Sequence, residues 1–189
     1  MKTKKKPYSM ELRAAAAEAT RERVLSAAGG AFLEGWYDDV TIAAIAKRAG
    51  VSGQTVINHY GSKEELATAA YERMSREITL RRSVPEPGDV RGALDVLVDD
   101  YEITGDATIR MLALEEKVPM LAPLLATGRE GHRRWVEEMF LAPELAPELM
   151  VATDVYTWKL LRRDQELTRD ETLAAMLRIV QALLERRTR

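Results

Sequence analysis

The sequence lacks cysteine altogether, and aromatic residues make up only 6% of its 189 residues. The absence of cysteine excludes disulfides and thiolate metal sites, and it fits a protein of the reducing cytoplasm, where we expect this chain to be located. No run approaches the roughly 18 apolar residues that a transmembrane helix needs. The alanine-rich stretch behind the N-terminal lysines is interrupted by Glu11, Arg13 and Glu18. We therefore expect neither a secretion signal nor membrane association.

Catalytic motifs are equally scarce. The chain has two histidines, His59 and His132, and contains no HExxH sequence, glycine-rich phosphate loop or nucleophile elbow. Glu115 and Glu116 would point to different sides of a helix, and the two Glu-x-x-His motifs of a carboxylate metal bundle are missing. We therefore expect no enzyme activity, no metal site and no cofactor.

Basic residues do not dominate the chain as a whole. The net charge is −2, with 28 Lys and Arg against 30 Asp and Glu, which is not the balance of a uniformly basic nucleic-acid binder. Four of the first six residues are lysines, so a small basic footprint lies at the N-terminus. This arm is either a phosphate-binding segment or a disordered tail with no fixed contact.

The residues that are abundant favour helices. Alternating runs of Val, Ile and Thr do not occur, while Ala, Leu, Glu and Arg dominate. We predict an all-α fold of about nine helices. The helical period places them at residues 10–36, two short helices within 41–60, and then 62–82, 89–103, 106–117, 120–140, 147–164 and 170–186.

The clearest boundary is the stretch RRSVPEPGDV, residues 81–90, which has two prolines and a glycine. We therefore expect an N-terminal domain over residues 1–82, with its core at 20–66 and a connecting helix at 62–82. A second helical domain, residues 83–189, should follow.

Residues 41–60 have the pattern of a helix-turn-helix. The small residue Ala46 stands where two helices would cross, and Gly50 follows where the turn needs a left-handed backbone. Thr41 and Ser52 are placed to N-cap the two helices. The apolar patch that would hold the helices together consists of Ile45, Val51 and Val56. A plain helical hairpin is the alternative, but it does not need these residue types at these offsets.

The second helix of this pair carries groups suited to reading bases in the major groove. These are Gln54, Thr55, Asn58 and His59. Gln and Asn can pair with the adenine edge, and Thr can touch a thymine methyl group. The helix has no Lys or Arg, so phosphate neutralisation must come from elsewhere, with Lys47, Arg48, Lys63 and the lysine arm as candidates. Helix N-termini also favour anions, which adds the Thr41 and Ser52 ends.

Residues 20–72 resemble the N-terminal domain of the TetR family of transcriptional regulators. The resemblance rests on Phe32 and Gly35 at the end of the first helix, on the sequence IA-x-x-AGVS and on SKEEL. Beyond Arg82 it is looser, although the last two helices are similar to the effector-binding half of such regulators. The resemblance implies a homodimer of nine-helix subunits, each with a DNA-binding head and a ligand-sensing body. Such a protein typically represses transcription from a palindromic operator until a small molecule binds.

Some positions depart from the family pattern. His59 and Lys63 match it, which implies a base or phosphate contact for each. Ile57 stands where the family usually has a tyrosine that reaches a phosphate, and Asn58 stands where a larger basic or aromatic residue is common. These departures imply an unusual DNA specificity. They also keep open an alternative, a small-molecule-binding or scaffold protein with a weak or degenerate DNA-binding head.

The second domain supplies candidates for an effector pocket and a dimer interface. Side chains that could line a pocket, or equally form core, are Tyr101, Met111, Leu114, His132, Trp135, Val136, Met139 and Trp158. The last two helices have apolar residues at three- and four-residue spacing. The resemblance places part of these in a dimer interface, with Leu149, Tyr156, Leu173, Met176, Leu177, Val180 and Leu184 as candidates. The alternative is that they face the core of one chain.

Overall fold

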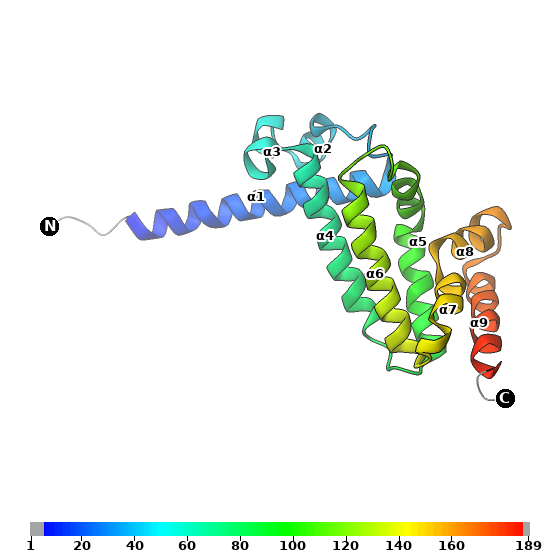
Figure 1. Ribbon diagram of the computed structural model, residues 1–189. Helices are drawn as coiled ribbons and strands as arrows, with labels where there is room; N and C mark the ends of the chain where they lie inside the picture. Colours follow the sequence, from blue (N-terminus) through cyan, green and yellow to red (C-terminus); the bar gives the residue numbers. More distant parts are fainter. Residues whose placement is uncertain (1–5, 187–189) are drawn as a thin grey trace. The chain divides into compact units, whose positions relative to one another are not determined.

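The computed structural model describes residues 6–186, with side chains from residue 10 onward. Its helices are α1 (Lys6–Glu34), α2 (Ile42–Ala49), α3 (Gly53–Tyr60), α4 (Lys63–Arg82), α5 (Val90–Leu114), α6 (Leu121–Phe140), α7 (Ala146–Thr153), α8 (Val155–Lys159) and α9 (Arg169–Arg186) (Figure 1). A short 3-10 helix, η1 (Pro143–Leu145), precedes α7, and a π-helical turn, η2 (Leu160–Asp164), follows α8. No strand occurs among the described residues. The predicted all-α fold is confirmed.

The chain divides into two compact units, which we call the head (Met1–Glu72) and the body (Arg73–Arg189). The division falls within α4, before the boundary that the sequence predicts at residue 82. The assignment of residues 1–82 to DNA binding and of residues 83–189 to ligand binding and dimerisation stays a prediction. None of the described helices is long and apolar enough to span a membrane.

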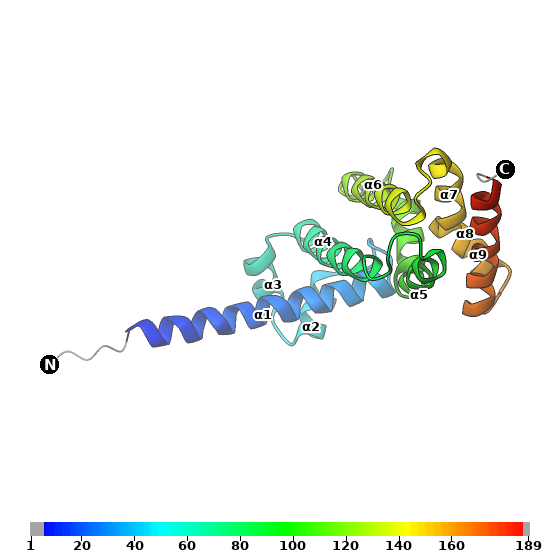
Figure 2. The same cartoon turned by 90° about the horizontal axis from the view of Figure 1, so that it is seen from below.

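The head is built on α1, against which α2 and α3 both pack (Figure 2). Its core consists of small and branched side chains that recur at helical spacing, with Val24, Ala28, Ile45, Val56 and Leu66 fully buried. The segment of α1 from Met10 to Ala19 is exposed, so it adds nothing to this core. Trp36, just past the end of α1, is 44% exposed.

The body is organised around α5, which contacts α6, α8 and α9 (Figure 1). α5 carries buried apolar residues on several sides, among them Leu94, Leu97 and Val98. A helix that is apolar around much of its circumference must be covered by several neighbours. This explains why α5 is the central helix of the body.

The predicted break at Gly105, between helices at 89–103 and 106–117, is wrong because α5 runs unbroken to Leu114. A Cβ atom at residue 105 would overlap the indole ring of Trp158. Trp158 is fully buried, and its Nε1 donates to Glu102 Oε1 at 3.1 Å. The glycine therefore allows a close approach of the indole to the helix backbone and does not end the helix.

The single helix predicted at 147–164 is interrupted at Asp154. The backbone of this residue is extended (φ −67°, ψ 151°), and its carboxylate accepts a hydrogen bond from the Tyr156 amide at 2.8 Å. Asp154 therefore N-caps α8, which continues into η2. The helical period continues across the cap, which is why the apolar pattern alone did not reveal the break.

Candidate nucleic-acid interface

The turn between α2 and α3 has the geometry that the sequence predicts. Gly50 lies in the left-handed region (φ 67°), and the amide of Val51 donates to Ala46 O at 3.0 Å. Ala46 is 3% exposed at the crossing, while Ile45 and Val56 are fully buried. Because glycine takes the left-handed conformation at little cost, the chain reverses here without strain. The helix-turn-helix is confirmed.

Both helices of this motif, and the start of α4, are capped by hydroxyl side chains. Thr41 Oγ1 accepts from the Ala44 amide and Ser52 Oγ from the Thr55 amide, each at 3.1 Å. Ser62 Oγ accepts from the Glu65 amide at 3.0 Å. Each cap satisfies one of the amides that a helix N-terminus leaves without a helical partner, and the remaining first-turn amides can meet an anion.

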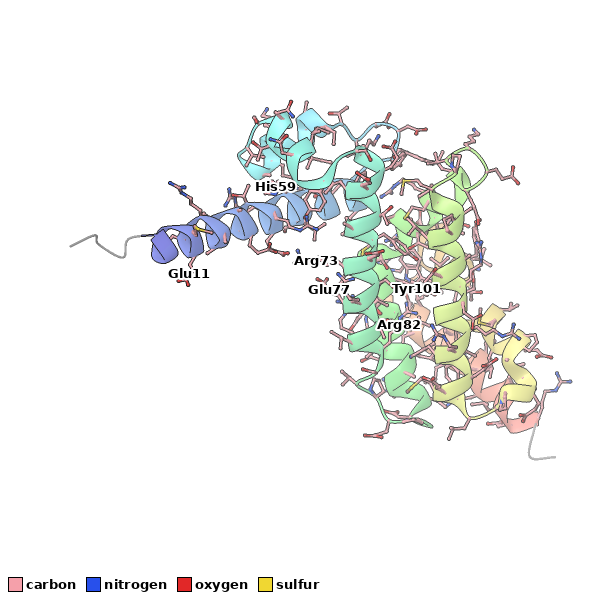
Figure 3. The ribbon with its side chains drawn as sticks, turned by 60° about the vertical axis from the view of Figure 1, so that its left-hand side comes forward. Glu11, His59, Arg73, Glu77, Arg82 and Tyr101 are labelled. Carbon is pink, nitrogen blue, oxygen red and sulfur yellow. The ribbon has the colours of Figure 1, made fainter. Side chains whose placement is uncertain are left out.

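The exposed face of α3 carries two amide side chains that bind each other. Gln54 Nε2 donates to Asn58 Oδ1 at 2.9 Å, and both residues are exposed. Thr55 is half-buried, with its hydroxyl 2.9 Å from Ser52 Oγ. His59 is also half-buried (labelled in Figure 3), and its carbonyl accepts from Arg21 Nη1 at 3.1 Å. The four residues predicted to read bases thus lie along one short helix, with the amide pair the most accessible.

Lys63, the first residue of α4, lies over the ring of Tyr37, with Nζ 4.2 Å from the ring centroid. The Tyr37 hydroxyl donates to Glu64 Oε1 at 3.2 Å, and the ring stacks on Phe32. Burial, followed by the charge of Glu64, raises the pKa of Tyr37 to about 12. Sequence analysis did not single out Tyr37, whose ring positions the ammonium of Lys63. An aromatic residue shortly after the Phe-x-x-Gly helix end was the signal available.

The other residues predicted to contact phosphates differ in whether their side chains already form an ion pair within the chain. Arg48 makes a two-pronged ion pair with Glu34, at 2.7 and 2.8 Å, whereas Lys47 is exposed. The side-chain hydrogen bond from Arg48 lowers the pKa of Glu34, so the pair stays ionised. Arg48 therefore brings less net charge to a nucleic acid than its position suggests. Of the lysine arm only Lys6, the first residue of α1, lies within the described residues, and its side chain does not.

Several of the predicted pocket side chains come together in the body. The rings of Tyr101 and Trp158 are 5.9 Å apart, and His132 stacks on Trp135 at 5.6 Å. The guanidinium of Arg82 lies 5.4 Å from the Tyr101 ring and 5.5 Å from the Trp135 ring. Arg82 and Tyr101 are labelled in Figure 3. Val136 and Met139 belong to the same core, whereas Met111 and Leu114 lie outside that cluster of buried residues.

This aromatic cluster contains a buried ionic centre that sequence reasoning missed. Asp100 is fully buried and accepts from Arg81 Nε at 2.7 Å and from Arg82 Nε at 2.8 Å. Arg82 Nη1 also reaches His132 Nδ1 at 3.3 Å. The Trp135 indole donates to the carbonyl of Arg82 at 3.2 Å. Arg81 and Arg82 open the sequence stretch interpreted as a boundary, so their role was obscured.

The hydrogen bonds around His132 fix its tautomer. Thr153 Oγ1 donates to Leu149 O at 2.7 Å, so it must accept from His132 Nε2 at 3.0 Å. His132 Nδ1 is then the acceptor that faces Arg82. Burial first, and the positive charge of Arg82 second, lower the pKa of His132 to about 3. The imidazole is therefore neutral at physiological pH.

The predicted dimer interface stays a prediction, and four of its residues are already buried within one chain. These are Leu149, Leu173, Met176 and Val180. The apolar stripe of α9 packs on α5 and α7 of its own body. Leu177 and Leu184 are partly buried against the same core, and only Tyr156, 54% exposed, stands clear of it.

Two comparisons bear on the identity of this chain. Residues 24–70 match the family described as bacterial regulatory proteins, tetR family. The chain is also 33% identical over 94 residues to the HTH-type transcriptional regulator BetI of Stenotrophomonas maltophilia (strain R551-3). Residues 24–70 of this chain are therefore similar to the TetR family. The match to BetI covers 46% of this chain and 48% of that relative, so it spans about half the length of the relative.

Solved structures extend the likeness of fold over most of the chain. A transcriptional regulator from Rhodococcus sp. Rha1 superposes with a TM-score of 0.71 at 19% identity, covering 87% of this chain and 96% of that one. A regulator from Aquifex aeolicus VF5 gives a TM-score of 0.66 at 19% identity, with 87% and 99% covered. At these identities the likeness concerns the fold alone. The predicted DNA-contacting residues, from Thr41 to Lys63, all fall within the segment that matches the TetR family.

Proposed function

We propose that this chain is a TetR-family protein, a homodimeric DNA-binding regulator of transcription in the cytoplasm. In this proposal it is a repressor that a small molecule releases from a palindromic operator. The observation that carries the proposal is the geometry of the head. α3 is capped by Ser52, fixed on α2 by the left-handed turn at Gly50, and presents exposed amides at Gln54 and Asn58. A second helix held in this way can enter the major groove.

Base reading and phosphate binding are divided between different elements in this proposal. Gln54, Thr55, Asn58 and His59 read bases from α3. Thr41, Ser52, Lys47 and Lys63 contact phosphates from the flanking helix starts and from α2. Because α3 has no Lys or Arg of its own, the affinity should be modest for the family.

For the dimer we propose a surface that the body leaves exposed in one chain. Large apolar side chains stand out from α7, α8, η2 and α9, and their exposed fractions are 70% for Val151, 54% for Tyr156, 51% for Leu160 and 43% for Ile179. Apolar residues gathered on neighbouring elements commonly mark an interface. Leu160→Glu and Ile179→Glu should produce monomers in sedimentation experiments. Leu80→Glu, at a 70% exposed leucine of α4, should leave a dimer and serves as the control.

The effector is proposed to bind in the body near the aromatic cluster of Tyr101, His132, Trp135 and Trp158. Rings of this kind supply apolar surface with a few polar groups, as small-molecule sites do.

The test is selection of bound duplexes from a random pool at two salt concentrations. The proposal predicts an enriched palindrome whose half-site centres lie about one helical turn apart, or a multiple of it. Purified Gln54→Ala protein provides the matched comparison, because it should lose the enriched sequence while retaining salt-sensitive binding to random DNA. If the wild-type protein enriches no sequence, the proposal fails. The chain would then be a helical ligand-binding or scaffold protein with a degenerate head.

A further inference from the structure

The amide pair on α3 is organised before any DNA is present. Gln54 and Asn58 are four residues apart and therefore adjacent on the helix surface, and their side chains are joined by the 2.9 Å hydrogen bond from Gln54 Nε2 to Asn58 Oδ1. Both are exposed on the face opposite Val56, which is fully buried. Two amides joined in this way lose less conformational freedom on binding than two independent side chains.

The shared hydrogen bond determines what the pair can offer to a base. It uses one N–H of the Gln54 amino group and one lone pair of the Asn58 carbonyl oxygen. The carbonyl oxygen of Gln54 remains available as an acceptor, and the amino group of Asn58 remains available as a donor. Exchanging the oxygen and nitrogen of both amides reverses their roles but again leaves one acceptor and one donor. The pattern presented to DNA is the same in either case.

One donor beside one acceptor matches adenine in the major groove. Adenine presents N7 as an acceptor and the N6 amino group as a donor, whereas guanine presents two acceptors, N7 and O6. Guanine is read best by a cationic side chain with two donors, and α3 has no Lys or Arg. The free acceptor of the pair therefore has a donor to meet on adenine and none on guanine.

Two neighbours of the pair favour the thymine of an adjoining A·T base pair. The hydroxyl of Thr55 is engaged with Ser52 Oγ at 2.9 Å, which leaves the methyl group as the apolar part of the side chain. Ile57 is 37% exposed and adds further apolar surface to α3. Thymine differs from the other bases in the major groove by a methyl group, for which apolar contact is the means of recognition.

We infer that Gln54 and Asn58 act as one unit that reads a single adenine in each half-site, and do not read two adenines separately. This inference rests on the proposed function. It assigns the specificity of the head to a coupled pair, with the donor of one amide directed to N7 and the acceptor of the other directed to the N6 amino group.

The experiment begins with the half-site enriched from the random pool. Each adenine in it is replaced in turn by 7-deazaadenine, which lacks N7, and by purine, which lacks the N6 amino group. Binding of each duplex is measured by fluorescence anisotropy for the wild type, Gln54→Ala, Asn58→Ala and the double variant. Circular dichroism and thermal unfolding verify that all four proteins fold alike.

The inference predicts one adenine at which both base modifications weaken wild-type binding, by about 5- to 150-fold for the pair of contacts together. Each single variant should become insensitive to both modifications at that same adenine. The double variant should bind little worse than either single variant, because removing one amide already disrupts the unit. Lys47→Ala, an exposed residue of α2, should instead weaken binding to all of these duplexes alike.

Other outcomes would overturn the inference in distinct ways. If the two variants lose sensitivity at different adenines and their losses multiply in the double variant, the amides read separate bases. If the variants alter selection at a G·C pair, the proposed complementarity is wrong while the protein remains a sequence-specific regulator. A pool without any enriched sequence would overturn the proposed function, and the adenine reading with it.

Discussion

The exposed face of α3 carries a side-chain hydrogen bond between residues four positions apart, whereas the ionic centre of the body joins side chains from different helices. Gln54 binds Asn58 and Ser52 binds the Thr55 amide, all on or beside one short helix. Asp100 of α5, in contrast, binds Arg82 of α4 and is fully buried. The amide pair of α3 stays exposed, while the buried carboxylate of the body holds helices together. Polar residues of these two places therefore differ in burial and in the distance along the chain that they span.

The largest effect should follow from removing the ionic centre of the body. Asp100→Ala leaves Arg82, whose side chain is only 11% exposed, without its carboxylate. Removing one partner of a buried ion pair lowers the stability of a protein by about 3–5 kcal/mol. We expect the free energy of unfolding, measured by urea denaturation, to fall by about this amount.

The neighbouring residue offers a matched control for this change. Asp99 pairs with Arg169, but its side chain is 61% exposed. Because solvent screens an exposed pair, Asp99→Ala should cost no more than about 1 kcal/mol. Equal losses for the two aspartates would show that the buried centre contributes nothing special to the body.

The second prediction concerns pH and His132, whose pKa is lowered from 6.5 to about 3 in the folded body. Between these values the unfolded chain binds a proton that the folded protein does not. Stability from this group is therefore complete above about pH 6.5 and is lost as the pH falls, by about 1.4 kcal/mol per pH unit within this window. The free energy of unfolding, measured by urea denaturation, should thus fall more steeply on acidification for the wild type than for His132→Gln. The glutamine side chain cannot take up a proton. Parallel curves for the two proteins would contradict a neutral, buried imidazole.

The smallest effect on stability is expected in the head. Thr41→Ala removes the cap of α2, a contact of 3.1 Å at an exposed site, and should cost about 1 kcal/mol. Thr41→Ser keeps a hydroxyl and should restore most of the loss. Comparing the loss of unfolding free energy in Thr41→Ala with that in Asp100→Ala tests whether polar groups of the head contribute little to folding. A cost as large as that of Asp100→Ala would remove the distinction between the two regions.

The motifs of the head were predictable because each is set by residues close in sequence. The caps at Thr41 and Ser52 and the left-handed turn at Gly50 depend on local conformation, which residue type largely determines. The exposed face of α3 followed from its helical period. The four-residue spacing also places Gln54 beside Asn58 on the helix, but the spacing alone does not show that the two side chains form a hydrogen bond.

The body was harder to predict because its decisive contacts join distant residues. Gly105 reads locally as a helix breaker, and only the indole of Trp158, more than fifty positions later, explains why a glycine lies inside α5. The apolar stripe of α9 predicts that Leu173 and Met176 are buried. It does not predict whether they are buried by the same chain or by a partner subunit. Hydrophobic spacing shows which side chains are buried and cannot name what buries them.

The three tryptophans are divided between these regions in a way that makes the protein its own optical reporter. Trp36 belongs to the head and is 44% exposed, while Trp135 and Trp158 are buried in the body. An aqueous quencher such as iodide should therefore suppress emission from Trp36 alone in the native protein. Fluorescence that is selectively quenched and fluorescence that resists quenching then report on the head and the body separately. No dye or label is needed to ask whether the two melt as one cooperative unit or as two.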